Sequence, residues 1–313
     1  MAVCQYISPL NADCVAWCNT HEYGNTLILG MYELRESTQT RQGALQVLQL
    51  TDSDSTLTLT VNQTLDTAAT FDVAWLPQTE QIFAVACADG TLRLHSFDGQ
   101  LQETAVLKCD TKAMCLNVSC FDNSVCMGLS NGDIVVMDVI QQDMLHKWHA
   151  HDFEAWSAAP DPTNHSLIWS GADDCMLKLW DTRDQGHALK TVRHDAGVTA
   201  ILPVESQPYI FTGSYDEHVR VFDTRMTKTP VAVCHVGGGA WRLRWHPSDS
   251  KRLLVAAMHT GAAELQIGDA FVPTITQQFI QHTSMVYDVS WCVGNSLAAS
   301  CSFYDRLLCV WMV

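Results

Sequence analysis

The chain consists of short runs in which apolar and polar residues alternate, and such runs recur along its whole length. TLRLHSF (91–97), MLKLWD (176–181) and HVRVFD (218–223) carry apolar residues at alternating positions. A period of two is typical of a β-strand with one buried face. Turn residues such as Asp89-Gly90 and Asn131-Gly132 separate the runs. No amphipathic helix of useful length is visible, so the pattern predicts an all-β fold.

The runs group into a repeated unit. Residues 171–183 read GADDCMLKLWDTR, and residues 213–225, which begin 42 positions later, read GSYDEHVRVFDTR. This period matches a four-stranded propeller blade. The same frame recurs at 87–97, 128–138 and 301–311, and short β-rich runs such as DVAWLP (72–77) precede it. Together the markers define seven units, of which units 1 and 6 are degenerate; they begin near residues 11, 69, 112, 151, 194, 236 and 282.

We therefore predict a single seven-bladed β-propeller that occupies residues 1–313 as one domain. The last unit ends at LLCVWMV after its third strand. The run VCQYIS (3–8) is the candidate for its fourth strand. Pairing of this run with the last blade would close the ring and remove a free sheet edge.

The unit resembles the repeat of the WD-repeat family. The resemblance implies a structural network of a histidine, a serine or threonine, an aspartate and a tryptophan in each regular blade. A buried aspartate that accepts hydrogen bonds from turn amides and a histidine needs no catalytic explanation. The network is expected on His151, Ser170, Asp174 and Trp180 in blade 4, on His194, residues 212–214, Asp216 and Phe222 in blade 5, and on His282, Ser300, Asp305 and Trp311 in blade 7.

Charge and cysteine content restrict the partners and the compartment. The chain has 18 Lys and Arg against 34 Asp and Glu, a net charge of −16. This argues against nucleic acid or an anionic membrane, because phosphate binding needs clustered basic charge. No apolar run approaches the ~18 residues of a membrane span, and the 13 scattered cysteines lack C-x-x-C spacing. We expect a cytoplasmic monomer with reduced thiols and without a cofactor or a metal.

The WD-repeat resemblance also implies which residues reach the mouth of the channel. They are the third and fifth residues after the repeat histidine and the residue before the turn aspartate. Here these positions combine aromatic rings with the carboxylates of Asp13, Glu154 and Asp173, an arrangement that suits a quaternary ammonium group at ~0.5–2 kcal/mol per ring face. A protein-binding surface is the alternative, and the one favoured by these positions alone. The aromatic candidates are Phe71, Trp156, Tyr215, Trp241, Tyr287 and Tyr304.

Longer strings carry a closer resemblance. WHAHDFEAWSA (148–158), GSYDEHVRVFDTR (213–225), GGAWRLRWHP (238–247) and CSFYDRLLCVW (301–311) are similar to the diphthine methylesterase family, also called diphthine methyltransferase. Blades 1 to 3 match more weakly. The resemblance implies hydrolysis of the methyl ester of methylated diphthine on translation elongation factor 2, giving diphthine and methanol in diphthamide biosynthesis. The trimethylammonium group of that side chain suits the aromatic mouth.

Ester hydrolysis needs a nucleophile with a base, or an activated water with a group that stabilises the oxyanion. The string GLSNG (128–132) has the form G-x-S-x-G, but it falls in a hairpin turn instead of a strand-to-helix elbow, so Ser130 is a poor candidate for a nucleophile. We favour an activated water. Glu154 and Asp173, on neighbouring strand ends, are the preferred candidates for its base.

Three further residues are candidates for the chemistry. His259 or His218 could serve as the base, and Arg242 could stabilise the oxyanion. Each candidate also has a structural explanation: Glu154 as a counter-charge to the ammonium group, His218 as a solvated turn residue, and Arg242 as a support for a neighbouring blade. Taken singly, each structural explanation outweighs the catalytic one.

Two other functions compete with the esterase. One is a non-catalytic WD-repeat adaptor that binds a basic protein, which would have no general reason to carry the strings at 151–156 and 213–218. The other is a methyltransferase, but the sequence lacks a strand, glycine-rich loop and helix for a nucleotide-type cofactor. Chiefly on the family resemblance, we expect a carboxylic ester hydrolase; composition and periodicity alone predict only an acidic seven-bladed propeller.

Overall fold

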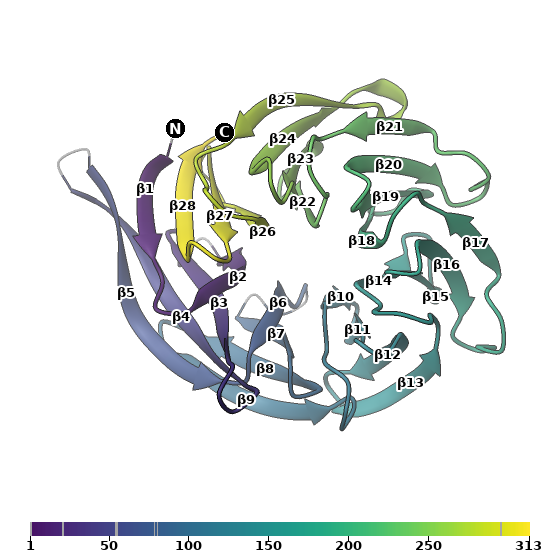
Figure 1. Cartoon of the computed structure of the whole chain (residues 1–313), viewed down its shortest axis with the longest axis horizontal. Coiled ribbons are helices and arrows are strands. Elements are labelled where there is room, and N and C mark those ends of the chain that lie inside the picture. Colours follow the sequence, from purple (N-terminus) through teal and green to yellow (C-terminus); the bar gives the residue numbers. More distant parts are fainter. Residues whose placement is uncertain (1, 21, 54–55, 78, 80, 295) are drawn as a thin grey trace.

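Seven four-stranded antiparallel sheets form a ring (Figure 1). The computed structural model describes the whole chain except residues 1, 21, 54–55, 78, 80 and 295. The described part consists of strands, connecting turns and one short 3-10 helix, η1 (Asp269–Phe271). It contains no helix long and apolar enough to cross a membrane. The predicted fold class, an all-β seven-bladed propeller, is confirmed.

Within each blade the strands follow one another outward from the centre of the ring, and β1 is the exception that joins blade 7 (Figure 1). Blade 1 contains β2 (Asn11–Trp17), β3 (Thr26–Arg35), β4 (Thr40–Ser53) and β5 (Thr56–Thr67), and blade 2 contains β6 (Thr70–Trp75), β7 (Ile82–Cys87), β8 (Thr91–Phe97) and β9 (Leu101–Lys108). Blade 3 contains β10 (Ser119–Phe121), β11 (Ser124–Gly128), β12 (Asp133–Asp138) and β13 (Asp143–His149), and blade 4 contains β14 (Ser157–Asp161), β15 (Asn164–Gly171), β16 (Met176–Asp181) and β17 (Lys190–Arg193). Blade 5 contains β18 (Val198–Pro203), β19 (Tyr209–Ser214), β20 (His218–Asp223) and β21 (Ala232–His235). Blade 6 contains β22 (Arg242–His246), β23 (Asp249–Ala256), β24 (Ala262–Ile267) and β25 (Pro273–Phe279). Blade 7 contains β26 (Val286–Trp291), β27 (Leu297–Ser302), β28 (Leu307–Met312) and β1 (Ala2–Ile7).

Burial along the strands explains the sequence pattern. The second strand β7 (IFAVAC) is buried from its second residue onward, because both of its faces pack against other blades. The outermost strands β17 and β21 alternate between half-buried and exposed residues, since one face meets solvent. The largest fully buried side chains include Trp169, Trp311 and Phe83. The hydrophobic core is therefore divided among the interfaces between blades.

The hairpin between the second and third strands of every blade contains a residue with positive φ. In blade 3 it is Gly132, where a Cβ atom would lie 1.9 Å from the carbonyl oxygen of His151, so only glycine fits. Because neighbouring strands are antiparallel, these hairpins lie at the same end of the ring as the connections between blades. This end is called the mouth below. The equivalent residues are Gln39, Gly90, Cys175, Glu217, Gly261 and Arg306.

The two ends of the chain meet in blade 7. β1 pairs antiparallel with β28, with Gln5 opposite Cys309 and Tyr6 opposite Leu308. The backbone N–H of Ser8 donates to the carbonyl oxygen of Arg306 at 2.9 Å. The N-terminal run thus supplies the outermost strand of the last blade, and Figure 1 shows β1 lying beside β28.

Blade 4 contains the complete histidine network of the repeat. His151 Nδ1 lies 2.8 Å from Asp174 Oδ2, and its Nε2 lies 2.7 Å from Ser170 Oγ. The indole N–H of Trp180 donates to the same hydroxyl at 2.8 Å. Burial lowers the pKa of His151, so the ring is neutral at physiological pH. The structural role predicted for these four residues is confirmed.

The other two networks vary the same arrangement. His282 contacts Ser300 Oγ at 2.7 Å and reaches Asp305 through the hydroxyl of Ser302. In blade 5 the expected contact between His194 and Asp216 is not made. Arg220 Nη1 donates to both carboxylate oxygens of Asp216 at 2.8 Å, while His194 Nε2 lies 3.0 Å from Thr212 Oγ1. The arginine thus replaces the histidine as the partner of that aspartate.

Candidate functional site

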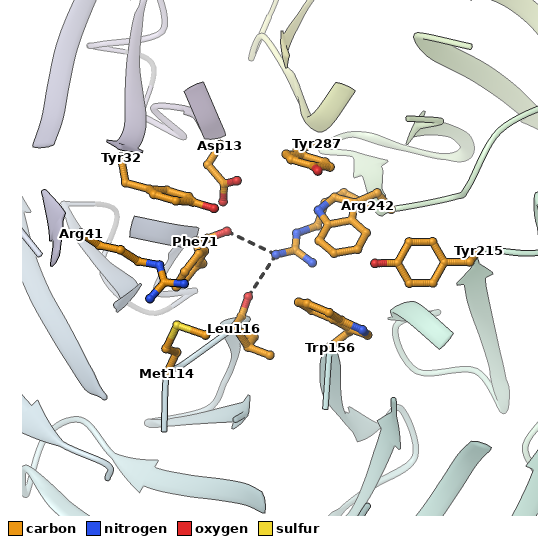
Figure 2. Close-up of a pocket in the computed structure, with 11 residues that line it drawn as sticks. Asp13, Tyr32, Arg41, Phe71, Met114, Leu116, Trp156, Tyr215, Arg242 and Tyr287 are labelled. Carbon is orange, nitrogen blue, oxygen red and sulfur yellow. Dashed lines mark hydrogen bonds between the residues drawn. The ribbon is translucent and has the colours of Figure 1, made fainter. Parts of the chain in front are cut away.

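A pocket of about 260 Å³ lies at the centre of the mouth, and every blade contributes to it (Figure 2). Five of the six predicted aromatic residues line it, together with Arg242 and Asp13. Tyr32, Arg41, Met114 and Leu116 complete the lining. The predicted residues that line the pocket are Phe71, Trp156, Tyr215, Trp241 and Tyr287.

Equivalent irregular positions of the innermost strands deliver four of these side chains. The strand register shifts at Asp13, Phe71 and Tyr287, and Trp241 directly precedes β22. Asp13, Phe71, Trp241 and Tyr287 each precede a strand tryptophan by four positions, namely Trp17, Trp75, Trp245 and Trp291. Residues at equivalent positions of equivalent strands point in the same direction. Blade 1 therefore places a carboxylate where three other blades place an aromatic ring.

Trp241 is the centre of an aromatic cluster on one side of the pocket. Its ring centroid lies 5.1 Å from that of Trp156, 5.6 Å from that of Tyr215 and 5.2 Å from that of Tyr287, and all three pairs are tilted. Burial raises the pKa of both tyrosines, so their hydroxyl groups stay protonated at physiological pH. Such a set of rings can receive a cation on its faces.

The opposite side of the pocket is built largely by blade 1. The ring of Tyr32 lies 5.0 Å from Phe71 and 5.0 Å from Phe303. Tyr32 and Arg41 come from the two strands of the long β3–β4 hairpin. Sequence reasoning missed both residues, because blade 1 lacks the repeat markers. In the structure Tyr32 pairs with Asn11, and the register of the two strands shifts between Ala12 and Cys14, at Asp13.

Asp13 has an unusual environment for a carboxylate. The residue is 8% exposed, and its side chain makes no hydrogen bond to any described residue. Burial raises the pKa of Asp13 well above its ordinary value; Arg242 opposes this increase, and the carboxylates of Asp288 and Asp72 add to it. A carboxylate that is short of donors and partly dehydrated is suited to accept a proton.

Arg242 forms the floor of the pocket. Its Nη2 donates to the carbonyl oxygens of Phe71 at 3.3 Å and Leu116 at 3.2 Å (Figure 2). The same nitrogen lies 3.7 Å from Asp72 Oδ2, and the residue is 6% exposed. The side chain therefore reaches from blade 6 to blades 2 and 3. This is a fixed cation at the bottom of the pocket.

A second arginine lies below the first. Arg244 Nη2 lies 2.9 Å from Asp72 Oδ1 and 3.3 Å from Asp288 Oδ2. Each carboxylate also accepts a backbone N–H from the next blade, Asp72 from Val118 at 3.0 Å and Asp288 from Val15 at 3.1 Å. This paired layer, formed by Arg244, Asp72 and Asp288, ties blades 1, 2, 3, 6 and 7 together.

Glu154 and Asp173, the preferred candidates for the base, lie next to the pocket without lining it. The backbone N–H of Asp173 donates to the carbonyl oxygen of Glu154 at 3.0 Å, so the two residues are neighbours. The indole N–H of Trp156 donates to Asp173 Oδ1 at 3.4 Å. Asp173 is exposed and Glu154 is half-buried. Neither carboxylate belongs to the lining of the pocket.

The remaining predicted residues also lie outside the pocket lining. His218 opens β20, the third strand of its blade, and its Nδ1 lies 2.6 Å from the carbonyl oxygen of Asp216. His259 is exposed on the β23–β24 hairpin. Tyr304 is 66% exposed, and its ring lies 5.0 Å from that of Phe303. Ser130 Oγ accepts the backbone N–H of Met114 at 2.9 Å, which is a structural role.

The site can hold a small group against aromatic rings, with one dehydrated carboxylate and one fixed arginine beside it. In the described part of the chain, no cluster of three or more His, Cys, Asp or Glu side chains could hold a metal.

Comparison with known proteins relates this propeller to WD-repeat proteins and to proteins named diphthine methyltransferase. The model of the WD domain, G-beta repeat, matches residues 142–181, 186–223 and 273–312. A protein of Schizosaccharomyces pombe named diphthine methyltransferase is 31% identical, over 97% of this chain and 98% of its own length. A mouse protein of the same name is 32% identical, over 95% of this chain and 71% of its own length. A chain in the crystal structure of a mitotic checkpoint complex superimposes with a TM-score of 0.76 at 16% identity, covering 99% of this chain and 93% of that one, which shows the fold alone.

Proposed function

Since this chain belongs to the diphthine methyltransferase family of WD-repeat proteins, we propose that it hydrolyses the methyl ester of methylated diphthine on translation elongation factor 2. The products are diphthine and methanol. The names of the relatives support an enzyme that acts on diphthine in diphthamide biosynthesis. Ester hydrolysis, in place of methyl transfer, is the finer step of this proposal.

The observation that carries the proposal is the composition of the pocket. Its aromatic cluster around Trp241 suits a trimethylammonium group, which cation–π contacts hold at ~0.5–2 kcal/mol each. Arg242 offers a fixed positive charge to the oxyanion of an ester under attack. Asp13 offers a carboxylate to a water molecule. One small site thus contains the groups that both ends of the proposed side chain require.

The surface around the pocket supports a protein substrate. Phe153 is 57% exposed, Ile280 72% and Tyr304 66%, and all three lie in loops at the mouth. The net charge of −16 favours a partner with a basic surface. Exposed apolar residues around a concave site are typical of a docking surface. The partner we propose is elongation factor 2 carrying methylated diphthine.

We further propose that the protein acts as a monomer in the cytoplasm. All seven blades of one chain contribute to the pocket, so a second copy is not needed to build it. Cys14, Cys87 and Cys126 are buried free thiols, which suits a reducing compartment.

The test is incubation of the purified protein with elongation factor 2 that carries methylated diphthine. We expect the modified peptide to lose the mass of one CH2 unit while methanol appears in equal amount. Stable binding without any mass change would favour the adaptor. A gain of methyl groups that depends on an added methyl donor would favour a transferase. The non-methylated factor is the control for binding.

A further inference from the structure

We propose that Asp13 is the general base of the hydrolysis and that the pocket is divided into a half that holds the ammonium group and a half that holds the ester. The inference rests on the proposed function and extends it to the residues that carry the chemistry. Glu154 and Asp173 then lie outside the reaction centre and act on the charge of the substrate.

The two halves lie on opposite sides of the Arg242 guanidinium group. Figure 2 shows Tyr32, Arg41 and Phe71 on one side, and Trp156 and Tyr215 on the other. The side with Trp156 carries the aromatic cluster, and the acidic neighbours Asp173 and Glu154 adjoin it. The side with Tyr32 carries Arg41 together with Asp13, and the guanidinium group of Arg242 separates it from the other side. A cation is therefore favoured on the first side, and a group that develops negative charge is favoured on the second.

Asp13 differs from the other carboxylates near the channel in having its oxygens free. Asp72 and Asp288 each accept a backbone N–H and pair with Arg244. Asp173 is exposed and accepts the indole N–H of Trp156. Asp13 makes no hydrogen bond to a described residue, although it is buried and lines the pocket. Its lone pairs are therefore available to a water molecule in the pocket, as a general base requires.

Arg242 is placed to bind the oxyanion. Among the described residues, its hydrogen bonds use Nη2 only, and these bonds fix the guanidinium plane. The N–H groups of Nε and Nη1 remain available. A donor that is held in place before the reaction stabilises a developing charge without reorganisation. Arg242 would thus act on the carbonyl oxygen while Asp13 acts on the water.

The proposed reaction balances without a co-reactant. Water attacks the ester carbonyl carbon, and the carboxylate of Asp13 takes one of its protons as the new C–O bond forms. The carbonyl oxygen becomes an oxyanion beside Arg242. The tetrahedral species then expels the methoxy group, which receives the proton from Asp13 and leaves as methanol. The carboxylic acid product releases its proton to solvent, and Asp13 is again a carboxylate.

The charged surroundings of Asp13 define the expected pH dependence. Burial raises the pKa of Asp13, so kcat should increase as the pH rises through a value above that of an ordinary aspartate. The positive charge that opposes this increase is Arg242, and Arg41 lines the same pocket. The titratable groups that face Asp13 from the neighbouring strands are Asp72, Asp288, Tyr32, Tyr287 and Cys301.

The test compares Asp13→Asn, Asp13→Ala and wild type on methyl-esterified elongation factor 2. Asp13→Asn should reduce kcat by about 100-fold or more, with little change in KM, because the substituted side chain cannot accept the proton. Formate should restore part of the kcat of Asp13→Ala, and the acidic limb of the pH profile should be absent from Asp13→Asn. Asp122→Asn makes the same substitution at an exposed carboxylate outside the pocket and should retain full activity.

Binding of tetramethylammonium, measured by calorimetry, reports on the ammonium half independently. We expect Asp13→Asn to bind this ion as tightly as wild type. A variant that keeps full kcat would overturn the role of Asp13, and so would one that loses tetramethylammonium binding together with activity, because that result would indicate a structural residue. If wild type itself releases no methanol, the proposed function fails and this inference fails with it.

Discussion

The paired layer and the pocket above it both contain aspartate and arginine, but the two regions differ in whether the aspartate side chains are hydrogen-bonded. In the paired layer, Asp72 and Asp288 face Arg244 and accept backbone N–H groups from the next blade. In the pocket, Asp13 is buried without a hydrogen bond to any described residue. Asp288 follows Tyr287, the residue at the position equivalent to Asp13, by one residue in sequence. A shift of one residue along an innermost strand therefore separates a paired, structural carboxylate from the one that we propose as the base.

The difference teaches how a propeller can carry chemistry without a special fold element. In blades 2 and 7 the register of the innermost strand shifts at the residue that lines the mouth, and the next residue, an aspartate, ties the blades together. Charges that are fully paired stabilise the ring. A charge that is left without donors costs folding free energy, and such sites are typical of function.

The largest effect should come from breaking the paired layer. Arg244→Met would leave Asp288 without its ion pair and Asp72 with Arg242 alone, at 3.7 Å, and we expect a loss of about 3–5 kcal/mol in the free energy of unfolding. Urea denaturation measures it. Arg183→Met is the matched control, since Arg183 pairs with Asp181 at the surface with its side chain 71% exposed, and no measurable change is expected there. A loss of less than about 1 kcal/mol for Arg244→Met would show that the layer is not needed for stability.

Next in size is the loss of one wall of the pocket. Trp156→Ala should weaken tetramethylammonium binding about tenfold, which corresponds to ~1.4 kcal/mol, because a ring face is removed from the cluster. Calorimetric titration gives the affinity. Trp156→Phe keeps a ring and should lose less. Phe153→Ala removes an exposed ring that does not line the pocket and should leave this affinity unchanged. Equal losses in Trp156→Ala and Phe153→Ala would place the ion on the outer surface.

A smaller effect, of opposite sign to that of Arg244→Met, is expected from Asp13→Asn. Folding raises the pKa of Asp13, so at pH values between its unfolded and folded pKa the native protein holds a proton that the unfolded chain has released. This contribution to stability is present at low pH and is lost as the pH rises through the folded pKa. Asp13→Asn should therefore be more stable than wild type at neutral pH, by about 1 kcal/mol, and the advantage should disappear on acidification.

Unfolding free energies of both proteins, measured across the acidic range, check this prediction. A variant that is less stable than wild type at neutral pH would mean that attraction between Asp13 and Arg242 outweighs the cost of burying the carboxylate. The direction of the pKa change in Asp13 would then be contradicted as well.

The sequence predicted the ring and much of the mouth, for a physical reason. The repeat fixes which residue of each innermost strand points to the mouth, so Phe71, Trp241 and Tyr287 could be located by alignment alone. The same alignment placed Asp13 at the mouth, but it contained no information on burial or on missing hydrogen-bond donors. Those properties depend on four blades at once, because Arg242, Asp72 and Asp288 reach Asp13 from blades 6, 2 and 7.

The repeat also contains no information on two other groups of residues: the predicted candidates that lie outside the pocket, and the lining residues that were not predicted. Asp173 and Glu154 were expected to share a site, and a backbone hydrogen bond does join them. Asp173, on the β15–β16 hairpin, is exposed, and Glu154, in the connection from β13 to β14, is half-buried. The repeat does not encode how deeply either residue lies. Tyr32 and Arg41 come from second and third strands, whose reach into the pocket depends on the extra length of the β3–β4 hairpin, where β4 has 14 residues.

The smallest effect is expected from substitution of Asp173, a carboxylate outside the pocket, and it should distinguish the role of Asp173 from that of Asp13. Asp173→Asn should weaken tetramethylammonium binding by about twofold at low salt, because an exposed charge near a cation contributes ~0.2–1 kcal/mol. Since salt screens exposed charges over ~10 Å at 0.1 M, the difference from wild type should vanish as the ionic strength is raised. The loss in Trp156→Ala should persist under the same conditions, because ring contacts are not screened in this way. If the loss in Asp173→Asn also persisted in salt, the carboxylate would act by orienting the Trp156 indole through their 3.4 Å hydrogen bond, and Asp173 would then belong to the pocket.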